Sequence, residues 1–383
     1  MKILHTSDLH IGKKLMGRER YDEFRAVFDG LKAICVQERV ELVLIAGDVF
    51  DTYTPSAEAE EIFYSGLKLL SEICAVLVIS GNHDDYVRLT AAAALAEELN
   101  AYIIGNNLSP VSCAKRGAVY PVKSGCGWVI FQNDAGERVY INALPYPNEA
   151  RFKEGRTDET FNEKIERWIA SGEEGKTEKM PSVFLSHIFV AGGSVSDSER
   201  EIDLGGARAV PLKLLPDCDY IALGHLHKRQ ILGTNAHYPG APMQFSFDES
   251  GSEKSVNVFD LTCDGVKNFK RVPVTVTKQL IRLQANSVAD GVALLNANPE
   301  RFVELTLNLR EPLTPQESSA LHECENLILL KAEFANARID DENKVSNKNK
   351  TSSQLFTEYY ALRYGDTAPD ELLALFLSLT EHE

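Results

Sequence analysis

Continuously apolar runs alternate with amphipathic stretches along the first part of the chain. Three runs, at 1–8, 41–48 and 75–81, are rich in β-branched and aliphatic residues, and helical patterns cover about Tyr21 to Arg39 and about Ser56 to Glu72. Such runs are typical of strands buried on both faces, and their alternation with helices predicts a parallel sheet. Each run ends in polar residues, so we expect a site at the carboxyl edge of this sheet.

After Ala101 the apolar runs become shorter. Strands are predicted in "GAVYPV", "GWVIFQ" and "RVYINALPYP", and a charged helix near Asp158 to Ser171. The strands "SVFLSH" and "CDYIALGHLH" follow, and both end in histidine. Together with the first part of the chain they predict one large domain over residues 1–274.

A second pattern of alternating strands and helices begins at residue 275. Three strands and two helices, near Val288 to Leu295 and Pro315 to Glu325, predict a small α+β cap domain over residues 275–337. Residues 338–353 include a polar run without core-forming residues and are predicted to be a linker. Residues 354–383 carry two amphipathic segments, which we expect to form C-terminal helices that dock on a partner or fold back on the cap.

The composition is that of a globular protein. Of 383 residues, 44% are hydrophobic and 25% charged, and no apolar run is long enough to span a membrane. The chain starts without a signal-peptide pattern, so we expect a cytoplasmic protein with no membrane association. Seven scattered cysteines without a Cys-x-x-Cys pair disfavour both a disulfide framework and a zinc ribbon.

The net charge is strongly negative. There are 40 Lys and Arg residues against 56 Asp and Glu residues, which gives −16. A protein that grips phosphates unaided usually presents a basic face. Any nucleic-acid role must therefore rely on metals, a local basic patch or a partner.

Five polar clusters follow predicted strands, namely "SDLH", "GDVFD", "GNHDD", "LSHIF" and "LGHLH". Their candidate metal ligands are Asp8, His10, Asp48, Asn82, His187, His225 and His227. Residues two apart in a strand point the same way, so each Asp-x-His or His-x-His pair can present two ligands to one pocket. Mixed imidazole and oxygen donors suit Mn²⁺, Fe²⁺ or Zn²⁺, and two ions about 3.5 to 4 Å apart would clamp a phosphorus centre.

The order of these clusters resembles that of the calcineurin-like metallophosphoesterases, D-x-H, GD, GNH, H and G-H-x-H. The resemblance implies an α/β fold, a β-sandwich flanked by helices. It also implies that one ion is held by Asp8, His10, Asp48 and His227, and the other by Asp48, Asn82, His187 and His225. His83 would be a catalytic histidine near the scissile phosphate that binds no metal.

A closer resemblance covers nearly the whole chain. The segments "MKILHTSDLHIGKKL", "VLIAGDVFDTYTPS", "SDSEREIDLGG" and "YPGAPMQFSFDE" resemble the SbcD family of bacterial nuclease subunits. That resemblance implies a Mn²⁺-dependent nuclease that degrades double-stranded DNA from 3′ to 5′ and cuts single strands and hairpins. It also implies a homodimer that works with an SbcC-type, SMC-like ATPase in DNA repair and recombination. The relatives often carry histidine where this chain has Asp51, whose carboxylate is a candidate to orient His83 in catalysis.

Two other functions remain compatible with the residues, a small-molecule or cyclic nucleotide phosphodiesterase and a scaffold that has lost its metals. The cap and tail disfavour the first, and the complete ligand set disfavours the second.

Candidate substrate contacts are six basic residues near the clusters, and a solvated surface is the alternative for them. They are Lys13, Lys14, Arg18, Arg20, Lys228 and Arg229. We also predict a substrate loop at Ala143 to Ala150 and a dimer surface on the helices at 21–40 and 56–72, which could instead pack on the sheet.

Overall fold

The computed structural model describes residues 1–108, 110–152, 158–177, 179–196, 198, 209–275 and 278–334, and positions 356, 357, 360, 369, 372 and 373. The chain divides into two compact units. The first contains Met1–Leu307 and Pro315–Lys331, and the second Asn308–Thr314 and Ala332–Glu383. The predicted linker, most of the predicted tail helices and most of the "SDSEREIDLGG" segment lie outside the described residues.

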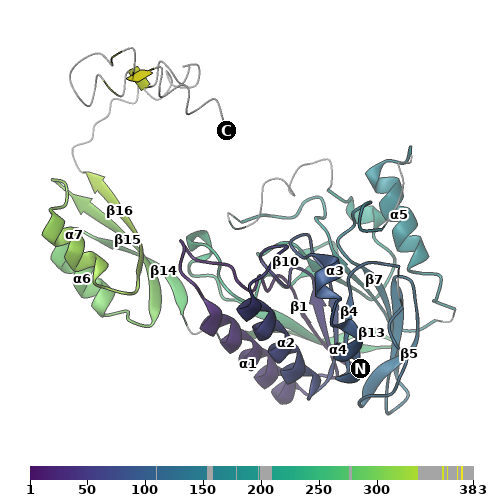
Figure 1. Cartoon of the computed structure of the whole chain (residues 1–383). Helices are drawn as coiled ribbons and strands as arrows, with labels where there is room; N and C mark the ends of the chain where they lie inside the picture. Colours follow the sequence, from purple (N-terminus) through teal and green to yellow (C-terminus); the bar gives the residue numbers. More distant parts are fainter. Residues whose placement is uncertain are drawn as a thin grey trace. The chain divides into compact units, whose positions relative to one another are not determined.

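The first sheet has six strands in the order β13-β12-β1-β2-β3-β4. They are β1 (Lys2–Thr6), β2 (Leu42–Ala46), β3 (Ala75–Ile79), β4 (Ala101–Ile104), β12 (Ser255–Thr262) and β13 (Gly265–Pro273). The strands β1 to β4 are parallel, the first three as the apolar runs predict, and β12 pairs antiparallel with β1. Helices α1 (Tyr21–Glu38) and α2 (Ala57–Ser71) lie side by side on this sheet, with α3 (Tyr86–Leu89) and α4 (Ala93–Glu98) beyond (Figure 1).

The second sheet has seven strands in the order β10-β11-β9-β8-β7-β6-β5. They are β5 (Val119–Gly125), β6 (Trp128–Asn133), β7 (Arg138–Leu144), β8 (Ser182–His187), β9 (Tyr220–Gly224), β10 (Gln230–Leu232) and β11 (Ala236–Tyr238). Helix α5 (Phe161–Ser171) covers its outer face through Ile165, Trp168 and Ile169. The described residues of this part also include the 3-10 turns η3 (Leu212–Leu214) and η4 (Phe247–Glu249).

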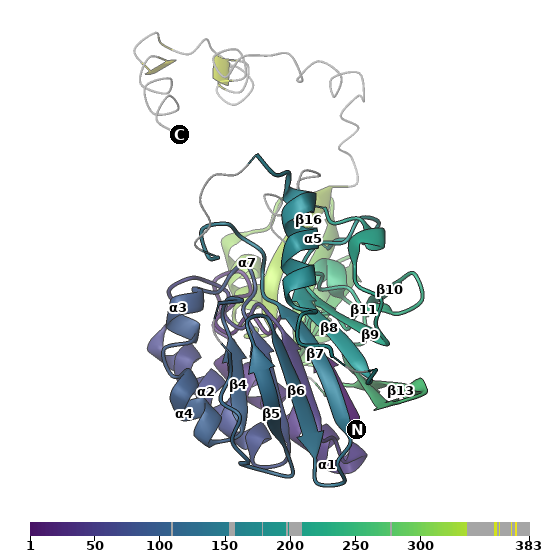
Figure 2. The same cartoon turned by 90° about the vertical axis from the view of Figure 1, so that its right-hand side faces the viewer.

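The inner faces of the two sheets form one continuous apolar core, so the fold is the predicted sandwich flanked by helices (Figure 2). Leu44 and Ile79 of the first sheet lie in the same buried cluster as Phe131 and Leu185 of the second. The central strands β2, β3, β8 and β9 are therefore buried on both faces, since helices cover the outer sides. That double burial explains why the central strands are continuously apolar.

A separate three-stranded sheet has the order β14-β15-β16. Its elements are β14 (Gln279–Ala285), α6 (Val288–Asn296), β15 (Arg301–Leu309), α7 (Pro315–His322) and β16 (Leu327–Phe334). These are the three strands and two helices that the sequence predicts for the cap. No helix among the described residues is both long and apolar enough to cross a membrane.

Gly66 allows α1 and α2 to approach closely, because a Cβ at this position would lie 2.4 Å from the ring of Phe28. Helix propensity favours Gly66→Ala by about 1 kcal/mol, but overpacking in a filled core costs about 1 to 3 kcal/mol. We therefore expect a lower urea midpoint for Gly66→Ala. The control is Ser65→Ala, exposed on the same helix and expected to change stability by less than about 0.5 kcal/mol. A stabilised Gly66→Ala chain would contradict this packing.

Candidate metal centre

The seven candidate ligands come from the carboxyl ends of five strands and meet at one edge of the sandwich. Asp8 and His10 follow β1, Asp48 follows β2 and Asn82 follows β3, all in the first sheet. The second sheet supplies His187 at the end of β8, and His225 and His227 directly after β9. Every one of these side chains is buried. The structure therefore brings the seven candidate ligands together.

Glycines allow the two sheets to touch at this edge. A Cβ at Gly224 would lie 1.8 Å from the carbonyl oxygen of Ala46, so no other residue fits there without moving a strand. Gly47 has a φ of 85°, and a Cβ there would lie 2.4 Å from Nδ1 of His187. Any larger residue would separate His187 from the ligands of the first sheet.

Four ligand residues hold left-handed backbone conformations that non-glycine residues rarely adopt. The φ values are 55° for Asp8, 44° for His10, 48° for Asp48 and 106° for His225. Main-chain hydrogen bonds stabilise the first loop against the second, with Asp8 N donating to Gly47 O at 3.0 Å and His10 N to Asp48 O at 3.0 Å. Backbone strain of this kind persists only where the surroundings impose it, and it is concentrated at functional sites.

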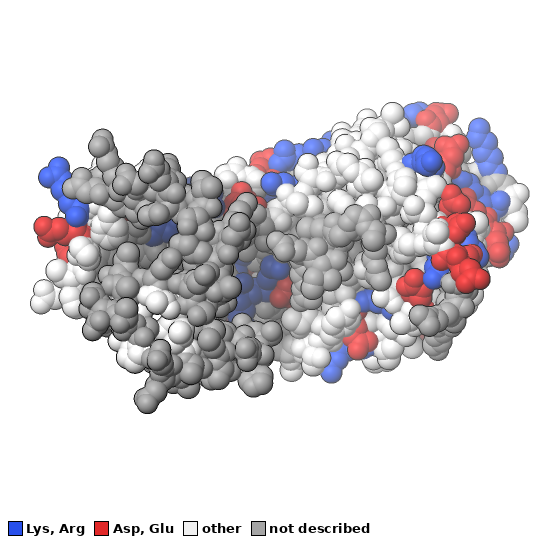
Figure 3. Space-filling model, turned by 90° about the horizontal axis from the view of Figure 1, so that it is seen from above, with Lys and Arg blue, Asp and Glu red and all other residues white. Residues whose placement is uncertain are grey.

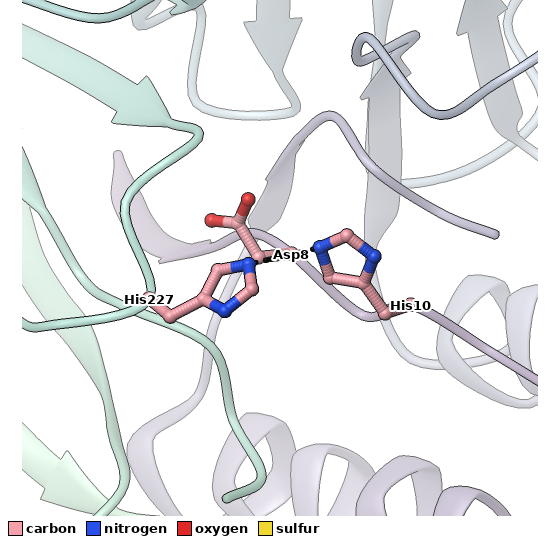
Figure 4. Close-up of side chains that lie close together, drawn as sticks. All are labelled: Asp8, His10 and His227. Atoms are coloured by element: carbon pink, nitrogen blue, oxygen red, sulfur yellow. Dashed lines mark hydrogen bonds between the residues drawn. The ribbon is translucent and has the colours of Figure 1, made fainter. Parts of the chain in front are cut away.

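A first group of possible ligands has donor atoms within 4.8 Å of one another. It consists of Asp8, His10 and His227. The Nε2 atoms of the two histidines are 3.0 Å apart, and their rings point toward each other beside the Asp8 carboxylate (Figure 4). The Nδ1 atom of His227 is 2.6 Å from Oγ of Ser198, which donates to Glu249 at 3.0 Å. This series of hydrogen bonds orients the ring so that Nε2 faces His10.

A second group lies on the other side of the Asp48 carboxylate. Its members are Asn82, His187, His225 and Asp48 itself. Nδ1 of His187 donates to the carbonyl of Ala46 at 2.8 Å, so in the neutral ring Nε2 carries the lone pair. This Nε2 lies 2.8 Å from Oδ1 of Asn82 and 3.4 Å from Oδ2 of Asp48. Nδ1 of His225 lies 3.1 Å from the same Asn82 oxygen.

The carboxylate of Asp48 is shared by the two groups. Its Oδ2 atom lies 3.4 Å from Nε2 of His10 and 3.4 Å from Nε2 of His187. Its Oδ1 atom accepts a hydrogen bond from the main-chain nitrogen of His83 at 2.9 Å, which fixes the carboxylate. One oxygen between two sets of imidazoles is the arrangement that a bridging metal ligand requires.

Burial and neighbouring charges set the protonation of these groups. Burial lowers the pKa of His10 to about 4 and that of His225 to about 3, so both rings are neutral at pH 7 and can offer lone pairs. Burial also raises the pKa of Asp8, to about 7. For His187, burial lowers the pKa, but the Asp48 and Asp8 carboxylates outweigh it and raise the pKa to about 9. Burial would raise the pKa of Asp48, but the surrounding histidines lower it well below its usual range.

The residues fit divalent cations. Nε2 of His225 is buried and has no hydrogen-bond partner among the described residues, a costly state that coordination would relieve. The donors around Asp48 are imidazole nitrogens, carboxylates and one amide oxygen, a set that suits first-row divalent metals.

His83 and Asp51 lie beside the two groups. Nδ1 of His83 donates to the main-chain carbonyl of Asp51 at 2.7 Å, and its Nε2 lies 4.0 Å from Oδ2 of Asp48. The hydrogen bond predicted for the Asp51 carboxylate is therefore made by its carbonyl group. The carboxylate lies 3.4 Å from Nδ1 of His10 and 3.2 Å from Nζ of Lys13. His83 also belongs to a possible ligand group with His10 and Asp48, although the sequence analysis predicts that it binds no metal.

The six basic residues predicted to contact the substrate lie in different environments. Arg20 is buried, donates to the carbonyl of Gln244 at 2.6 Å and cannot reach a substrate. Arg18 donates to the carbonyl of Glu325 and lies over the ring of Phe302 at 5.1 Å, so it serves the packing of the cap. Lys14 pairs with Glu19 at the surface.

Three of the six basic residues remain candidates for substrate contact, namely Lys13, Lys228 and Arg229. Lys13 contacts Asp51, and the other two directly follow His227. Basic and acidic side chains alternate along the right-hand margin of Figure 3.

Arg151 has a role that the sequence analysis does not predict. It is buried, and its guanidinium donates to the carbonyls of Gly81 at 2.7 Å, Asn82 at 3.3 Å and Asp84 at 2.8 Å. The adjoining predicted substrate loop also contacts this turn, because Tyr146 N donates to Ser80 O at 3.0 Å. A lone arginine after a loop carries no sequence signal, since its partners are main-chain carbonyls.

Asp84 is a second such residue. Its buried carboxylate accepts hydrogen bonds from the main-chain nitrogens of Val49 at 3.2 Å, Phe50 at 2.9 Å and Gly81 at 2.8 Å. It thereby links the loop after β2 to the loop after β3. The "GNHDD" cluster contains this residue, and its position beside His83 is the only signal that could have drawn attention to it.

Comparisons of the whole sequence with known proteins agree on one family. The profile described as calcineurin-like phosphoesterase matches residues 1–229. The chain is 34% identical to the SbcD component of the nuclease SbcCD from Bacillus subtilis, covering 99% of this chain and 97% of that protein. Proteins of the same name are 30% identical in Rhodobacter capsulatus, over 82% of each chain, and 28% identical in Escherichia coli K12, over 75% of this chain and 71% of that one.

Replacement of Arg151 by Met tests whether it holds the turn that carries Asn82. We expect Arg151→Met to weaken divalent-cation binding by about 10- to 100-fold, because groups that support metal ligands have effects of that size. Isothermal titration well below the melting temperature would measure it, and Arg151→Lys should recover only part of the loss. The control is Arg88→Met, which removes an ion pair with Glu60. Wild-type affinity in Arg151→Met would rule out a positioning role.

Proposed function

The chain belongs to the calcineurin-like phosphoesterase family, and from this premise we propose that it is a Mn²⁺-dependent DNA nuclease. The observation that carries the proposal is the position of Asp48 Oδ2, 3.4 Å from both His10 and His187. The 34% identity to a nuclease component over 99% of the chain supports DNA as the substrate. The proposed reaction is hydrolysis of a phosphodiester bond with two divalent cations.

We assign the ligands in two sets that share Asp48. Asp8, His10 and His227 complete the first set. Asn82, His187 and His225 complete the second. The mixed nitrogen and oxygen donors, without thiolate, support Mn²⁺ over a structural zinc site.

When bound, the two cations would supply a hydroxide at neutral pH and neutralise the phosphoryl oxygens. In this proposal His83 acts on the leaving oxygen. Because its Nδ1 proton is held by the Asp51 carbonyl, its Nε2 is the nitrogen that can hold a proton for the leaving oxygen. Asp51 is proposed to support catalysis through its pairing with His10 and Lys13.

The activities and partners of the chain are proposed from its relatives. We propose 3′-to-5′ degradation of double-stranded DNA, cleavage of single strands and hairpins, and action with an SbcC-type ATPase. The charge of −16 supports a need for such a partner in DNA binding. In this assignment residues 1–274 carry catalysis and 275–337 cap the DNA. Residues 338–353 link the cap to the partner-binding segment 354–383.

A homodimer is supported by an apolar surface groove between α2 and α4. Tyr64 and Leu67 of α2 and Leu95 and Leu99 of the α4 segment line a cavity of about 190 Å³. Leu95 is 74% exposed and Leu99 48% exposed, which is unfavourable unless another chain covers them. The predicted faces of α1 and α2 mostly pack on the sheet, so the proposed surface shifts to α4.

Two substitutions distinguish metal binding from chemistry. His83→Ala should retain both cations but cleave a short oligonucleotide at least about 100-fold more slowly, since the lost group is a proton donor. Asp48→Ala should weaken both cations together. The measurements are Mn²⁺ titration and cleavage of labelled duplex, hairpin and single-stranded DNA. Loss of a cation in His83→Ala would overturn the assignment of that residue. Hydrolysis of cyclic nucleotides without cleavage of DNA would instead support a small-molecule phosphodiesterase.

The groove predicts that Leu95→Glu gives a monomer, because a buried charge at the centre of an apolar interface is costly. Light scattering at micromolar concentration would measure the mass, and Leu108→Glu, at an exposed leucine that does not line the groove, is the control. A monomeric wild-type chain, or a dimeric Leu95→Glu chain, would contradict this surface.

A further inference from the structure

A second cavity adjoins the metal centre, separated from it by the turn that carries His227. It measures about 510 Å³, and His227 forms part of its wall. Its other lining residues are Ser194, Lys228, Arg229, Gln230, Pro239, Ser252, Glu253, Lys254, Ser255 and Arg271. No residue of this wall other than His227 takes part in the proposed chemistry. The hydrolysis of the phosphodiester therefore does not account for this cavity.

The cavity has more positive than negative charge. Of its four basic side chains, Lys254 pairs with the buried Glu249, and Arg271 pairs with Glu253 at 3.1 Å. Among the described residues, Lys228 and Arg229 have no carboxylate partner, and Lys228 donates only to the carbonyl of Val195 at 3.5 Å. The described wall therefore holds two uncompensated positive charges in a chain whose net charge is −16.

Arg229 is the least satisfied of these groups. Its Nε atom is buried and makes no hydrogen bond to a described residue. Arg271 lines the same cavity. An anion in the cavity would satisfy the buried Nε donor of Arg229.

The neutral groups of the wall indicate what kind of anion fits. Three serines and a glutamine accompany the basic residues, and the described wall contains no aromatic side chain that could stack on a base apart from His227 itself. Arginine, lysine, serine and glutamine are the residues that contact phosphate and sugar in nucleic-acid complexes. The chemistry favours a sugar and phosphate ligand over a base.

The cavity is also connected to the metal centre. Nζ of Lys254 donates to the carbonyl of His227 at 3.2 Å and pairs with Glu249, which accepts from Ser198 beside His227. The wall of the cavity is therefore joined to the metal centre through His227 and Ser198.

We propose that this cavity binds the sugar–phosphate backbone of the substrate strand next to the phosphodiester that is cleaved. The proposal rests on the nuclease function and adds a strand-binding subsite to it. Lys228 and Arg229 supply the anchoring charges. The serines and Gln230 contact phosphate and sugar oxygens without reading the base.

The test is binding of a fluorescein-labelled short oligothymidylate to the full chain in EDTA, measured by anisotropy. We expect Lys228→Gln/Arg229→Gln to weaken binding by about tenfold or more, because the charged hydrogen bonds from both side chains to phosphate are lost. The dependence of log K on log salt should become shallower by about 1.4, at about 0.7 per lost phosphate contact on a single strand. The matched control is Lys123→Gln/Arg138→Gln, on β5 and β7, which lie away from the β10 and β11 edge. Thermal melting would verify that all variants are folded.

Unchanged affinity in Lys228→Gln/Arg229→Gln, or no binding by the wild type, would overturn the proposal. Inorganic phosphate and thymidine monophosphate serve as competitors. If either binds as tightly as the oligonucleotide, the cavity is a site for a free phosphate compound and the strand assignment fails. Cleavage of the same oligonucleotide by the wild type after addition of Mn²⁺ tests the nuclease function separately. Binding that depends on Lys228 and Arg229 without cleavage would disprove the nuclease and leave the strand site standing.

Discussion

The contact between the two sheets at Gly224 and Ala46 is the constraint on which the candidate centre depends. The carbonyl of Ala46 is approached by the Gly224 backbone and also accepts a hydrogen bond from His187. Because the sheets touch there, ligands from β8 and β9 reach the carboxylate of Asp48, which belongs to the first sheet. A side chain at residue 224 would move one sheet away from the other and separate the two halves of the centre.

This close approach leaves many polar groups in a dry interior, and the loops are organised to satisfy them. Asp84 and Arg151 act in complementary ways, since the carboxylate accepts from main-chain nitrogens and the guanidinium donates to main-chain carbonyls of the same turn. Buried groups of this kind cost about 1 to 3 kcal/mol each when unsatisfied. The turn that carries Asn82 and His83 is therefore held by its backbone, and its two side chains remain available for the site.

The local pattern of the sequence predicts most of the strands, but not β4 or β10 to β13, and it predicts the longer helices and the polar residues at the strand ends. It succeeds because apolar runs and the polar residues that end them are local features, and parallel strands align their carboxyl ends. Contacts that depend on the paths of loops were not predictable. Asp51 contacts His83 through its carbonyl, which any residue could supply, and Arg20 turns inward although Glu19 before it is exposed. The sequence analysis names Lys228 and Arg229 as candidate substrate contacts, but the cavity that they line is completed by residues of β12 and β13, which it does not predict.

The left-handed backbone at Asp8, His10, Asp48 and His225 has an evolutionary consequence. Glycine adopts such conformations without strain, so at these positions the substitution that removes a ligand would also relax the main chain. Selection for stability and selection for activity therefore act in opposite directions at the same four residues. A lineage released from the need for catalysis would accumulate glycine there while its sandwich core stayed intact.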